Sequence, residues 1–415
     1  MLPDVINPWK QRLKTYPTII VAGYCITLVL WLLSMDQLMD SRQQIFAGDF
    51  LAFWSAGRIW CELGFEQVYR DLAQKAMHAH ASAAYPNVMR FAYPPFALYL
   101  FGGLGALPFV PAAFAFIYGT MTMLGVVLHR ILGRVDLTML FLAAPAALWC
   151  VLRGQSSFLL AAVFGIAMLC LPRRQVLAGL AIAVLAIKPQ LGLLLPIALL
   201  AAGFYRAFAA AAIAVLALIG STLIVFDLAI WERWLFAADA VGRLVNQNGD
   251  FIFPPNLPAS IYGTGLMLGT PRLPMLIMHF VVAAIAAGIA LWCCWQYRKG
   301  KLDWPLAGAV VIAATLLVNP YILIYDLTLL LIPMAILFQH ARQDTPLKYE
   351  YRSVLLILLL PALTDVIALT TGIQLVSVVI IAALALLMRR ILSDLGIRPA
   401  IQTDQPWIDF GHPKS

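Results

Sequence analysis

Four charged residues stand apart from the rest of this sequence: Asp49, Arg153, Lys188 and Asp326. Arg153 and Lys188 each interrupt a long apolar run, at a depth where an unpaired charge in a membrane costs several kcal/mol. Two cations at neighbouring breaks, together with freed backbone groups, suit a phosphate. A carboxylate held near such a phosphate can act as a general base on a hydroxyl group. These residue types therefore predict an anion site with a base beside it.

Each of these residues also has a simpler interpretation. Arg153 and Lys188 could extend to lipid headgroups, or pair with an acid such as Asp250. Asp49 could cap a helix, since Asp before a helical run is a common start signal. The two cations together favour a phosphate, whereas the sequence around Asp49 by itself favours the cap.

The remaining polar residues indicate little chemistry. Asp326 follows Tyr325 at the outer end of a later apolar run, so it can reach the same cavity. His78 and His80 are two positions apart, which places them on different helix faces and argues against a metal pair. No P-loop, Rossmann, GxSxG or HExxH pattern occurs. The sequence therefore predicts no metal site and no cofactor.

The elements that must position these residues are strongly apolar. Of the 415 residues, 62% are hydrophobic and only 12% are charged, against about 25% charged in soluble domains. So few charges cannot cover the apolar surface of an ordinary soluble enzyme. The net charge of +8 forms no basic stripe, which argues against a nucleic-acid partner. We expect an all-α polytopic membrane protein that forms a single integral membrane domain over residues 1–415.

A membrane-spanning helix needs about 20 apolar residues. Besides eight clear runs of about this length, the sequence has two longer apolar runs, 137–171 and 175–205. The first is broken near the middle at Arg153–Ser157 and the second at Lys188-Pro189-Gln190. Each longer run is predicted to form two antiparallel limbs. With eight clear runs this gives about twelve transmembrane helices. The clear runs are 17–35, 109–129, 207–226, 274–296, 304–318, 321–339, 353–370 and 373–390.

The distribution of Lys and Arg sets the expected orientation. Most of these cations fall on one side if 93–107 forms a half-helix that dips into the membrane and returns, which puts both termini in the cytoplasm with 391–415 as a cytoplasmic tail. Two long segments, 36–108 and 227–273, then lie on the outer face, and both carry the aromatics and Pro-Pro breaks typical of chains along a membrane surface. For a bacterium, the expected location is the cell inner (plasma) membrane, with the site facing the periplasm or exterior.

Five short motifs occur in a characteristic order across residues 48–330: Gly48-Asp49-Phe50 with Trp54 and Ala56-Gly57-Arg58, then Phe91-Ala-Tyr-Pro-Pro, Arg153-Gly-Gln, Ala178-Gly179 running to Lys188-Pro-Gln, and Asn319-Pro-Tyr-Ile-Leu-Ile-Tyr-Asp326. This ordered set resembles glycosyltransferase family 87. The family comprises integral membrane glycosyltransferases of the C-type fold, including polyprenyl-phosphate-mannose-dependent mannosyltransferases. The resemblance covers about two thirds of the chain.

The resemblance implies a sugar donor on polyprenyl phosphate and a metal-independent, inverting transfer to a lipid or glycan hydroxyl. It implies that Asp49 is the general base, which reverses the preference for a helix cap, and that Lys188 and Arg153 bind the donor phosphate. The second outer segment is expected to order over the donor. Mannose is one candidate sugar, although the mannosyltransferase branch carries histidines where this chain has Tyr325-Asp326. The candidate substrate-binding residues are Arg58, Tyr93, Gln155, Gln190, Asn256, Tyr325 and Asp326.

Two other classes of protein compete with this interpretation. A polytopic transporter or a lipid-linked-sugar flippase also places buried cations at broken helices. The missing inverted repeat and the two long outer segments argue against a carrier that rocks between states. A non-catalytic assembly subunit is the third possibility, and the polar residues gathered on one face argue against it.

Overall fold

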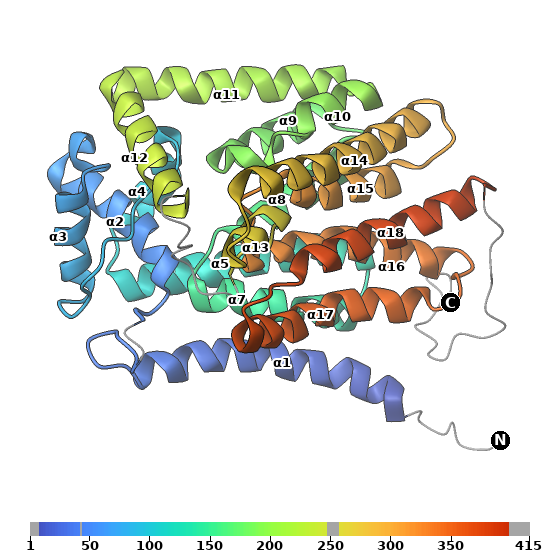
Figure 1. The fold of residues 1–415 in the computed structure, drawn as a ribbon, viewed down its shortest axis with the longest axis horizontal. Coiled ribbons are helices and arrows are strands. Elements are labelled where there is room, and N and C mark those ends of the chain that lie inside the picture. The colour runs from blue at the N-terminus through green and yellow to red at the C-terminus, as the bar shows by residue number, and fades with distance from the viewer. Residues whose placement is uncertain (1–7, 42–43, 247–256, 398–415) are drawn as a thin grey trace.

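The computed structural model describes residues 8–41, 44–246 and 257–397, which are built from helices (Figure 1). In these ranges no β-strand occurs, and extended pairing is limited to isolated bridges such as Pro258 with Leu323. Helices satisfy their backbone hydrogen bonds internally, as a lipid environment requires. The predicted all-α class is confirmed.

Each run predicted as a clear span forms a helix. Of the described helices, seven are long and apolar enough to cross a membrane, whereas α15, with 15 residues, is shorter. The last helix continues to Asp394, so the first part of the predicted tail 391–415 is helical and residues 398–415 lie outside the described ranges. The helices are α1 (Pro8–Leu33), α5 (Phe109–Leu132), α11 (Tyr205–Val225), α14 (Arg272–Arg298), α15 (Trp304–Val318), η5 (Ile324–Leu330) continued by α16 (Leu331–Gln343), α17 (Glu350–Thr371) and α18 (Val376–Asp394).

Both ambiguous runs break at the predicted positions, and the first run also bends at residues 143–144, before Pro145, which the sequence analysis does not predict. In the first, α6 (Val135–Leu142) and α7 (Pro145–Arg153) are bent by 66°, and α8 (Ser157–Cys170) follows. In the second, α9 (Gln175–Val184) and η3 (Leu185–Ile187) end at Lys188, and η4 (Pro189–Leu191) and α10 (Leu195–Ala202) follow. Proline disfavours a helical backbone at the residue before it, which explains the break at Lys188. Counting α6–α7 as one span raises the number of long spans in the described ranges to eight.

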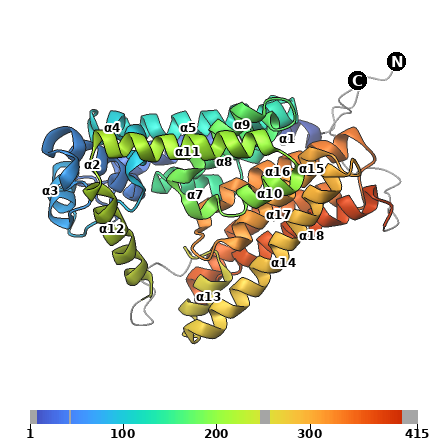
Figure 2. The same cartoon turned by 90° about the horizontal axis from the view of Figure 1, so that it is seen from above.

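The first predicted outer segment and α12 of the second lie together at the left of Figures 1 and 2, whereas α13 lies nearer the middle, beside α14. The indole of Trp234 donates a hydrogen bond of 3.1 Å to the carbonyl of Ala92, and the rings of Trp231 and Phe96 are 6.1 Å apart. These contacts join one segment to the other. The first contains α2 (Gly48–Leu63), η1 (Phe65–Gln67), α3 (Asp71–Ala81), η2 (Pro95–Ala97) and α4 (Leu98–Gly105), and the second contains α12 (Ala229–Asn246) and α13 (Ile261–Met267).

The core and the lipid-facing surface can be told apart by burial. In the span formed by η5 and α16, 89% of the most apolar window is buried, against 11% in α11. Both pass as apolar enough to cross a membrane, and an apolar helix surface that is left exposed in this way is stable in lipid but not in water. We therefore assign η5–α16 to the core and α11 to the lipid-facing side.

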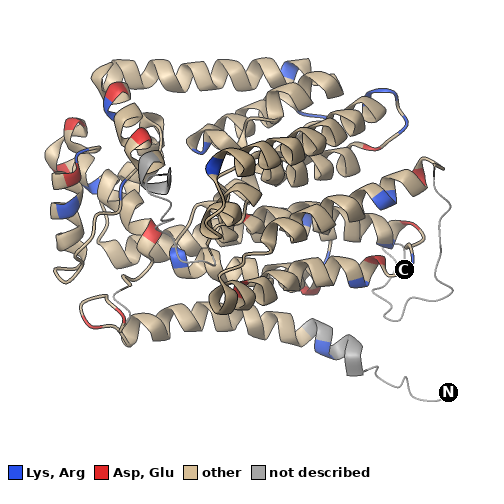
Figure 3. Ribbon diagram, viewed as in Figure 1, with Lys and Arg blue, Asp and Glu red and all other residues tan. Residues whose placement is uncertain are grey.

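Charged residues concentrate at the helix ends. Figure 3 shows Lys and Arg in the loop between α14 and α15 and near the end of α18, at the opposite end of the molecule from α3 and α12. Arg298 is the last residue of α14, and Lys299 and Lys301 lie in this loop. Few charges interrupt the long helices, as expected for segments that pass through lipid.

Candidate active site

Asp49 is the second residue of α2, and its carboxylate contacts the break between α7 and α8. The helix begins at Gly48, and its N-cap is Ala47, whose backbone is left-handed with φ 45° and ψ 49°. No side chain caps this helix end, so the interpretation of Asp49 as a helix cap is wrong. Instead, Oδ2 of Asp49 accepts a hydrogen bond of 2.8 Å from Nε2 of Gln155.

Gly154 allows this break to approach α2 closely. Its φ of 66° lies in the left-handed region, which glycine adopts without steric cost. A Cβ at this position would be 2.7 Å from Cβ of Phe50 and 3.2 Å from Cβ of Ala47. A side chain here would push the break away from α2. The glycine therefore lets the next residue, Gln155, reach Asp49.

The side-chain amide of Gln155 connects three parts of the structure. Its Nε2 atom donates to Asp49 and also to the hydroxyl of Tyr325, at 3.0 Å. Its Oε1 atom accepts a hydrogen bond of 3.2 Å from the backbone N–H of Ser156. Because the amide oxygen is engaged in this way, the NH₂ group is the side of the amide that faces the carboxylate.

Lys188 and Asp326 form a buried ion pair, with 2.6 Å between Nζ and Oδ1. The hydroxyl of Ser157 donates to the same Oδ1 at 2.9 Å, and the backbone N–H of Leu323 donates to Oδ2 at 3.2 Å. A buried pair of charges needs such additional hydrogen bonds, because removing both charges from water is costly. The partner of Lys188 is thus Asp326. The alternative partner, Asp250, lies outside the described residues.

Tyr93 joins the first outer segment to this cluster. Its hydroxyl is 3.2 Å from Oγ of Ser156, and its carbonyl accepts a hydrogen bond of 2.8 Å from the hydroxyl of Tyr69. Across the cluster, Nζ of Lys188 lies 5.4 Å from the centre of the Tyr325 ring. Two tyrosines therefore flank the ion pair and the carboxylate.

Arg153 is the half-exposed last residue of α7. Within the described part of the chain it forms no hydrogen bond or ion pair. Its charge nevertheless acts on Asp49, since it lowers the pKa of that carboxyl group. A guanidinium group with free N–H donors beside a cluster of polar groups can bind an anion through two parallel hydrogen bonds.

Burial raises the pKa of Asp49 above its ordinary value. Arg153, the hydrogen bond from Gln155, and Lys188 each lower this pKa, and the negative charge of Asp326 raises it again. The net direction is upward. A carboxylate with a raised pKa is a stronger base than an exposed one, so this environment suits a residue that takes up a proton.

Three candidate residues are not brought into this cluster by any described contact. Arg58 pairs with Glu62 at 2.5 Å and donates to the carbonyl of Gly105 at 3.3 Å. Gln190 is half-buried in η4, and it makes no hydrogen bond to the residues that the structure describes. Asn256 lies outside the described residues.

Sequence reasoning did not single out Ser156 and Ser157. Both belong to the interruption after Arg153 that the sequence predicts as a break, but a serine at a break is usually explained by local backbone bonding. Their position between a cation and an apolar run was the available signal. In the structure they hold Tyr93 and Asp326.

The part of the second outer segment that precedes α13 pairs with the turn that precedes η5. The backbone N–H of Ala259 donates to the carbonyl of Ile322, and that of Ile324 donates to the carbonyl of Leu257, both at 2.9 Å. The turn before Tyr325 is therefore held between the core and the outer segment.

The histidines lie as the sequence predicts. His78 is buried, with Nε2 3.3 Å from Oγ of Ser55, and His80 is exposed, so the two point to different faces. Among the described residues, one group of His, Cys, Asp or Glu side chains has the spacing to hold a metal ion, and it does not include Asp49. That group is His340, Asp344 and Asp394.

A model of glycosyltransferase family 87 matches residues 91–320. The match includes the motifs around Tyr93, Arg153 and Lys188, whereas Asp49 and Asp326 lie outside it. No curated protein and no solved structure matches the chain. The family match covers more than half of the residues, and the apolar helices are those of a multi-pass membrane protein. The chain therefore belongs to glycosyltransferase family 87 and is a membrane glycosyltransferase.

Proposed function

We propose that this glycosyltransferase moves a sugar from a polyprenyl-phosphate donor to a hydroxyl group of a lipid or glycan acceptor, with inversion and with Asp49 as the general base. The observation that supports this most directly is the Asp49 carboxylate, held by Gln155 within the electrostatic reach of Arg153 and Lys188. An inverting transfer needs one base and stabilisation of the departing phosphate. The cluster offers groups for both.

The proposed reaction is a single displacement. The acceptor oxygen attacks the anomeric carbon on the face opposite the phosphate. The new carbon–oxygen bond forms while the bond from that carbon to the phosphate oxygen breaks, and its electron pair leaves with the phosphate. Asp49 takes the proton of the acceptor hydroxyl, and its raised pKa favours this step.

Arg153 and Lys188 share the donor phosphate in this proposal. Arg153 has no partner among the described residues, so its guanidinium can bind two phosphate oxygens. Lys188 gives one of its three N–H donors to Asp326 and keeps two. Together they stabilise the negative charge that the leaving phosphate acquires.

The donor sugar is proposed to lie between Tyr93 and Tyr325 and next to Gln155. In this proposal Asp326 orients Lys188. Mannose is one candidate for this sugar.

Three substrate contacts are proposed outside the cluster. Gln190 follows Lys188 by two positions, and Asn256 belongs to the second outer segment, which would close over the donor. To bind the substrate, Arg58 would have to break its ion pair with Glu62 and pair with a substrate group instead.

The proposed membrane arrangement follows the charge distribution of the chain. It has the C-type fold, about twelve crossings, both termini in the cytoplasm and the Asp49 cluster at the outer face of the inner (plasma) membrane. The shorter apolar helices α8, α9–η3, η4–α10 and α15 would supply the crossings beyond the longer spans. The single membrane domain would cover residues 1–415.

Family membership favours a transferase over the transporter or flippase alternative. A flippase would move a lipid-linked sugar without breaking its bond to phosphate. Turnover of the donor into a new glycoside therefore separates the two activities, and a purified enzyme is sufficient to measure it.

The decisive experiment incubates purified protein with a panel of labelled polyprenyl-phosphate sugars and a total lipid extract as acceptor. Labelled product is expected from at least one donor, and it should be absent with Asp49→Asn. The matched control is Asp71→Asn in the same outer segment, because the exposed pair of Asp71 with Arg90 contributes little. Product formed from nucleotide sugars alone would show that the proposed donor class is wrong.

A further inference from the structure

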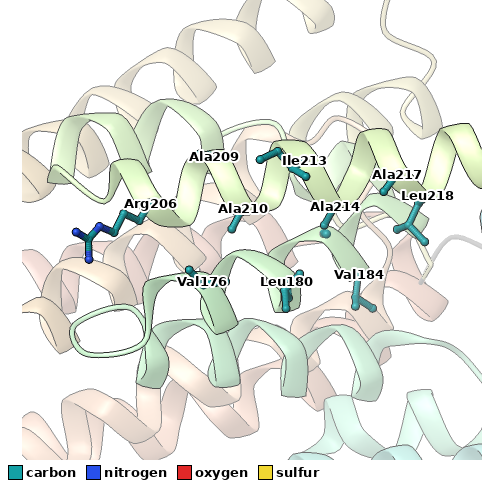
Figure 4. A pocket seen from close by; sticks show the side chains of 11 residues that line it. Val176, Leu180, Val184, Arg206, Ala209, Ala210, Ile213, Ala214, Ala217 and Leu218 are labelled. Carbon is teal, nitrogen blue, oxygen red and sulfur yellow. The ribbon is translucent and has the colours of Figure 1, made fainter.

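An apolar groove of about 880 Å³ lies between α9 and α11. Figure 4 shows its side chains on both helices, with Val176, Leu180 and Val184 along α9 and a longer series along α11. The series on α11 starts with a charged residue, Arg206, and all other lining side chains are apolar. They are Val176, Leu180, Ala183 and Val184 on α9, and Ala209, Ala210, Ile213, Ala214, Ala217 and Leu218 on α11.

The groove is built by two helices in close contact. A Cβ on Gly179 would lie 2.5 Å from the carbonyl oxygen of Ala207 and 2.7 Å from Cβ of Ala210. This contact fixes the distance between α9 and α11 on their buried side, while Leu180 and Ile213 are exposed on the other. The groove is thus a defined surface between packed helices.

One end of the groove is positively charged. The two helices run in the same direction in Figure 4, so both begin at the end marked by Arg206. Arg206 is exposed, and it forms no hydrogen bond or ion pair within the described ranges. Arg173 and Arg174 directly precede α9 and are also exposed.

The helix ends add to this charge. Neither α9 nor α11 has an acidic residue in its first turn, and neither has a side-chain cap. Positive helix N-termini favour anions, so they reinforce the arginines. The guanidinium of Arg298, at the end of α14, lies 5.8 Å from the ring of Tyr205 and belongs to the same region.

We propose that this groove binds an anionic phospholipid, with the phosphate at Arg206 and the acyl chains along α9 and α11 toward Val184. Apolar walls with a cluster of cations at one end are the combination that an anionic lipid recognises. This site goes beyond the proposed sugar transfer. Its charged end is at the start of α9, whereas Lys188 follows the other end of that limb.

A different lipid could enter the groove from its other end. Val184 is four positions before Lys188, so the tail of a polyprenyl-phosphate donor could lie along the same walls. Such a tail would need no cation at Arg206, and it would compete with the phospholipid. Replacing Arg206 should therefore weaken the binding of a phospholipid but leave the binding of a polyprenyl-phosphate tail unchanged.

The experiment measures lipid retained on the full-length protein in mild detergent by native mass spectrometry. Phosphatidylglycerol is compared with phosphatidylcholine, and inorganic phosphate is a separate competitor. Arg206→Gln should reduce the affinity for phosphatidylglycerol roughly fivefold, and Ala214→Trp should abolish retention by filling the groove.

Two variants serve as matched controls, Arg130→Gln and Ala212→Trp. Arg130 is exposed in the last turn of α5, and Ala212 is exposed on α11; neither lines the groove. Both should retain phosphatidylglycerol as the unmodified protein does.

Retention of one phosphatidylglycerol that phosphatidylcholine and inorganic phosphate do not displace supports the site. Equal retention of the two lipids would overturn the proposal, and so would equal losses in the groove variants and their controls. Displacement by inorganic phosphate alone would indicate an anion site without a lipid. Displacement of phosphatidylglycerol by polyprenyl phosphate, unchanged by Arg206→Gln, would assign the groove to the donor tail and reject the phospholipid. Sugar transfer measured in parallel shows whether each variant is folded.

Discussion

Nε2 of Gln155 donates a hydrogen bond of 2.8 Å to the carboxylate of Asp49 across 106 positions of the chain. The same nitrogen donates to the hydroxyl of Tyr325 at 3.0 Å. A hydrogen bond of this kind favours the charged form of the carboxyl group and fixes its orientation. Gln155 therefore positions the proposed base, and the predictions below begin from this contact.

Replacing Asp49 by Asn should remove the base while keeping the shape of the side chain. We expect kcat to fall by about 10²–10⁴-fold, the usual contribution of a general base, whereas donor binding persists. Single-turnover rates and equilibrium binding of the donor measure the two effects separately. Transfer at the original rate by the Asn variant would show that another group takes the proton.

Gln155→Leu should raise the pKa of Asp49, because the variant loses a hydrogen bond to the charged carboxylate. Such bonds contribute about 1.5–3 kcal/mol, which corresponds to an upward shift of roughly 1–2 pH units in the acid limb of kcat/KM. The matched control is Gln67→Leu, since Gln67 lies in η1 and its side chain makes no hydrogen bond to a described residue. An unchanged acid limb in Gln155→Leu would contradict the positioning role.

The unmodified enzyme should lose activity as the pH falls through the pKa of Asp49. Burial raises this pKa, so the acid limb should lie above the ordinary value of about 3.9. Arg153 lowers the same pKa, and Arg153→Gln should therefore move the limb to higher pH. Lys188 acts in the same direction as Arg153, and Asp326 acts against both.

The same Arg153 variant should also weaken donor binding, because a free guanidinium is lost. Arg70→Gln is the control, since Arg70 is exposed in the first outer segment and its side chain has no described contact with the cluster. Binding and pH profiles measured on both variants test the role of Arg153. A shift of the acid limb to lower pH in Arg153→Gln would contradict the predicted effect of Arg153 on the pKa of Asp49.

Lys188→Met should destabilise the protein as well as weaken donor binding. The change leaves Asp326 buried and unpaired, which costs about 3–5 kcal/mol. Adding Asp326→Leu should recover most of the thermal stability, because an apolar pair can replace a buried ion pair. Donor binding should remain weak in the double variant. Normal donor affinity in that variant would exclude a phosphate role for Lys188.

The proposed topology can be checked with single cysteines and a membrane-impermeant thiol reagent. Cys61 is the exposed native cysteine among the described residues, so Cys61→Ala provides the background. Asn87→Cys and Ala106→Cys should both react from outside if η2 and α4 dip into the membrane and return. Lys301→Cys should react only after the membrane is opened. Labelling of Asn87→Cys alone would show that this segment crosses.

Much of the architecture could be predicted from local patterns. The break at Lys188 follows from a proline after it, and the break at Arg153 from a charge and a glycine in an apolar run. The sequence is less informative about the length of the limbs, because short apolar helices such as α8 are compatible with a span, a half-span or a buried core helix. Resemblance to the family rested on short motifs in order, and the family match confirms it for residues 91–320.

The candidate site was predictable only as a set of residue types. Arg58 and Gln190 occur in the same motifs as residues of the cluster, yet no described contact brings them to it. Ser156 and Ser157 were not predicted, because serine at a break has a sufficient local explanation. Helix packing decides which of several polar residues come into contact, and the pattern of residues along the chain does not specify that packing.

The sequence by itself determined that this chain lies in a membrane, where its apolar runs break and to which family it belongs. These are local properties of run length, proline position and motif order. Only the tertiary structure decided that Asp326 neutralises Lys188 across 138 positions and that Gln155 holds Asp49 across 106. The physical reason is that both contacts need distant helices to approach within hydrogen-bond distance. That approach depends on details of packing, such as the absence of a side chain at Gly154 against Phe50.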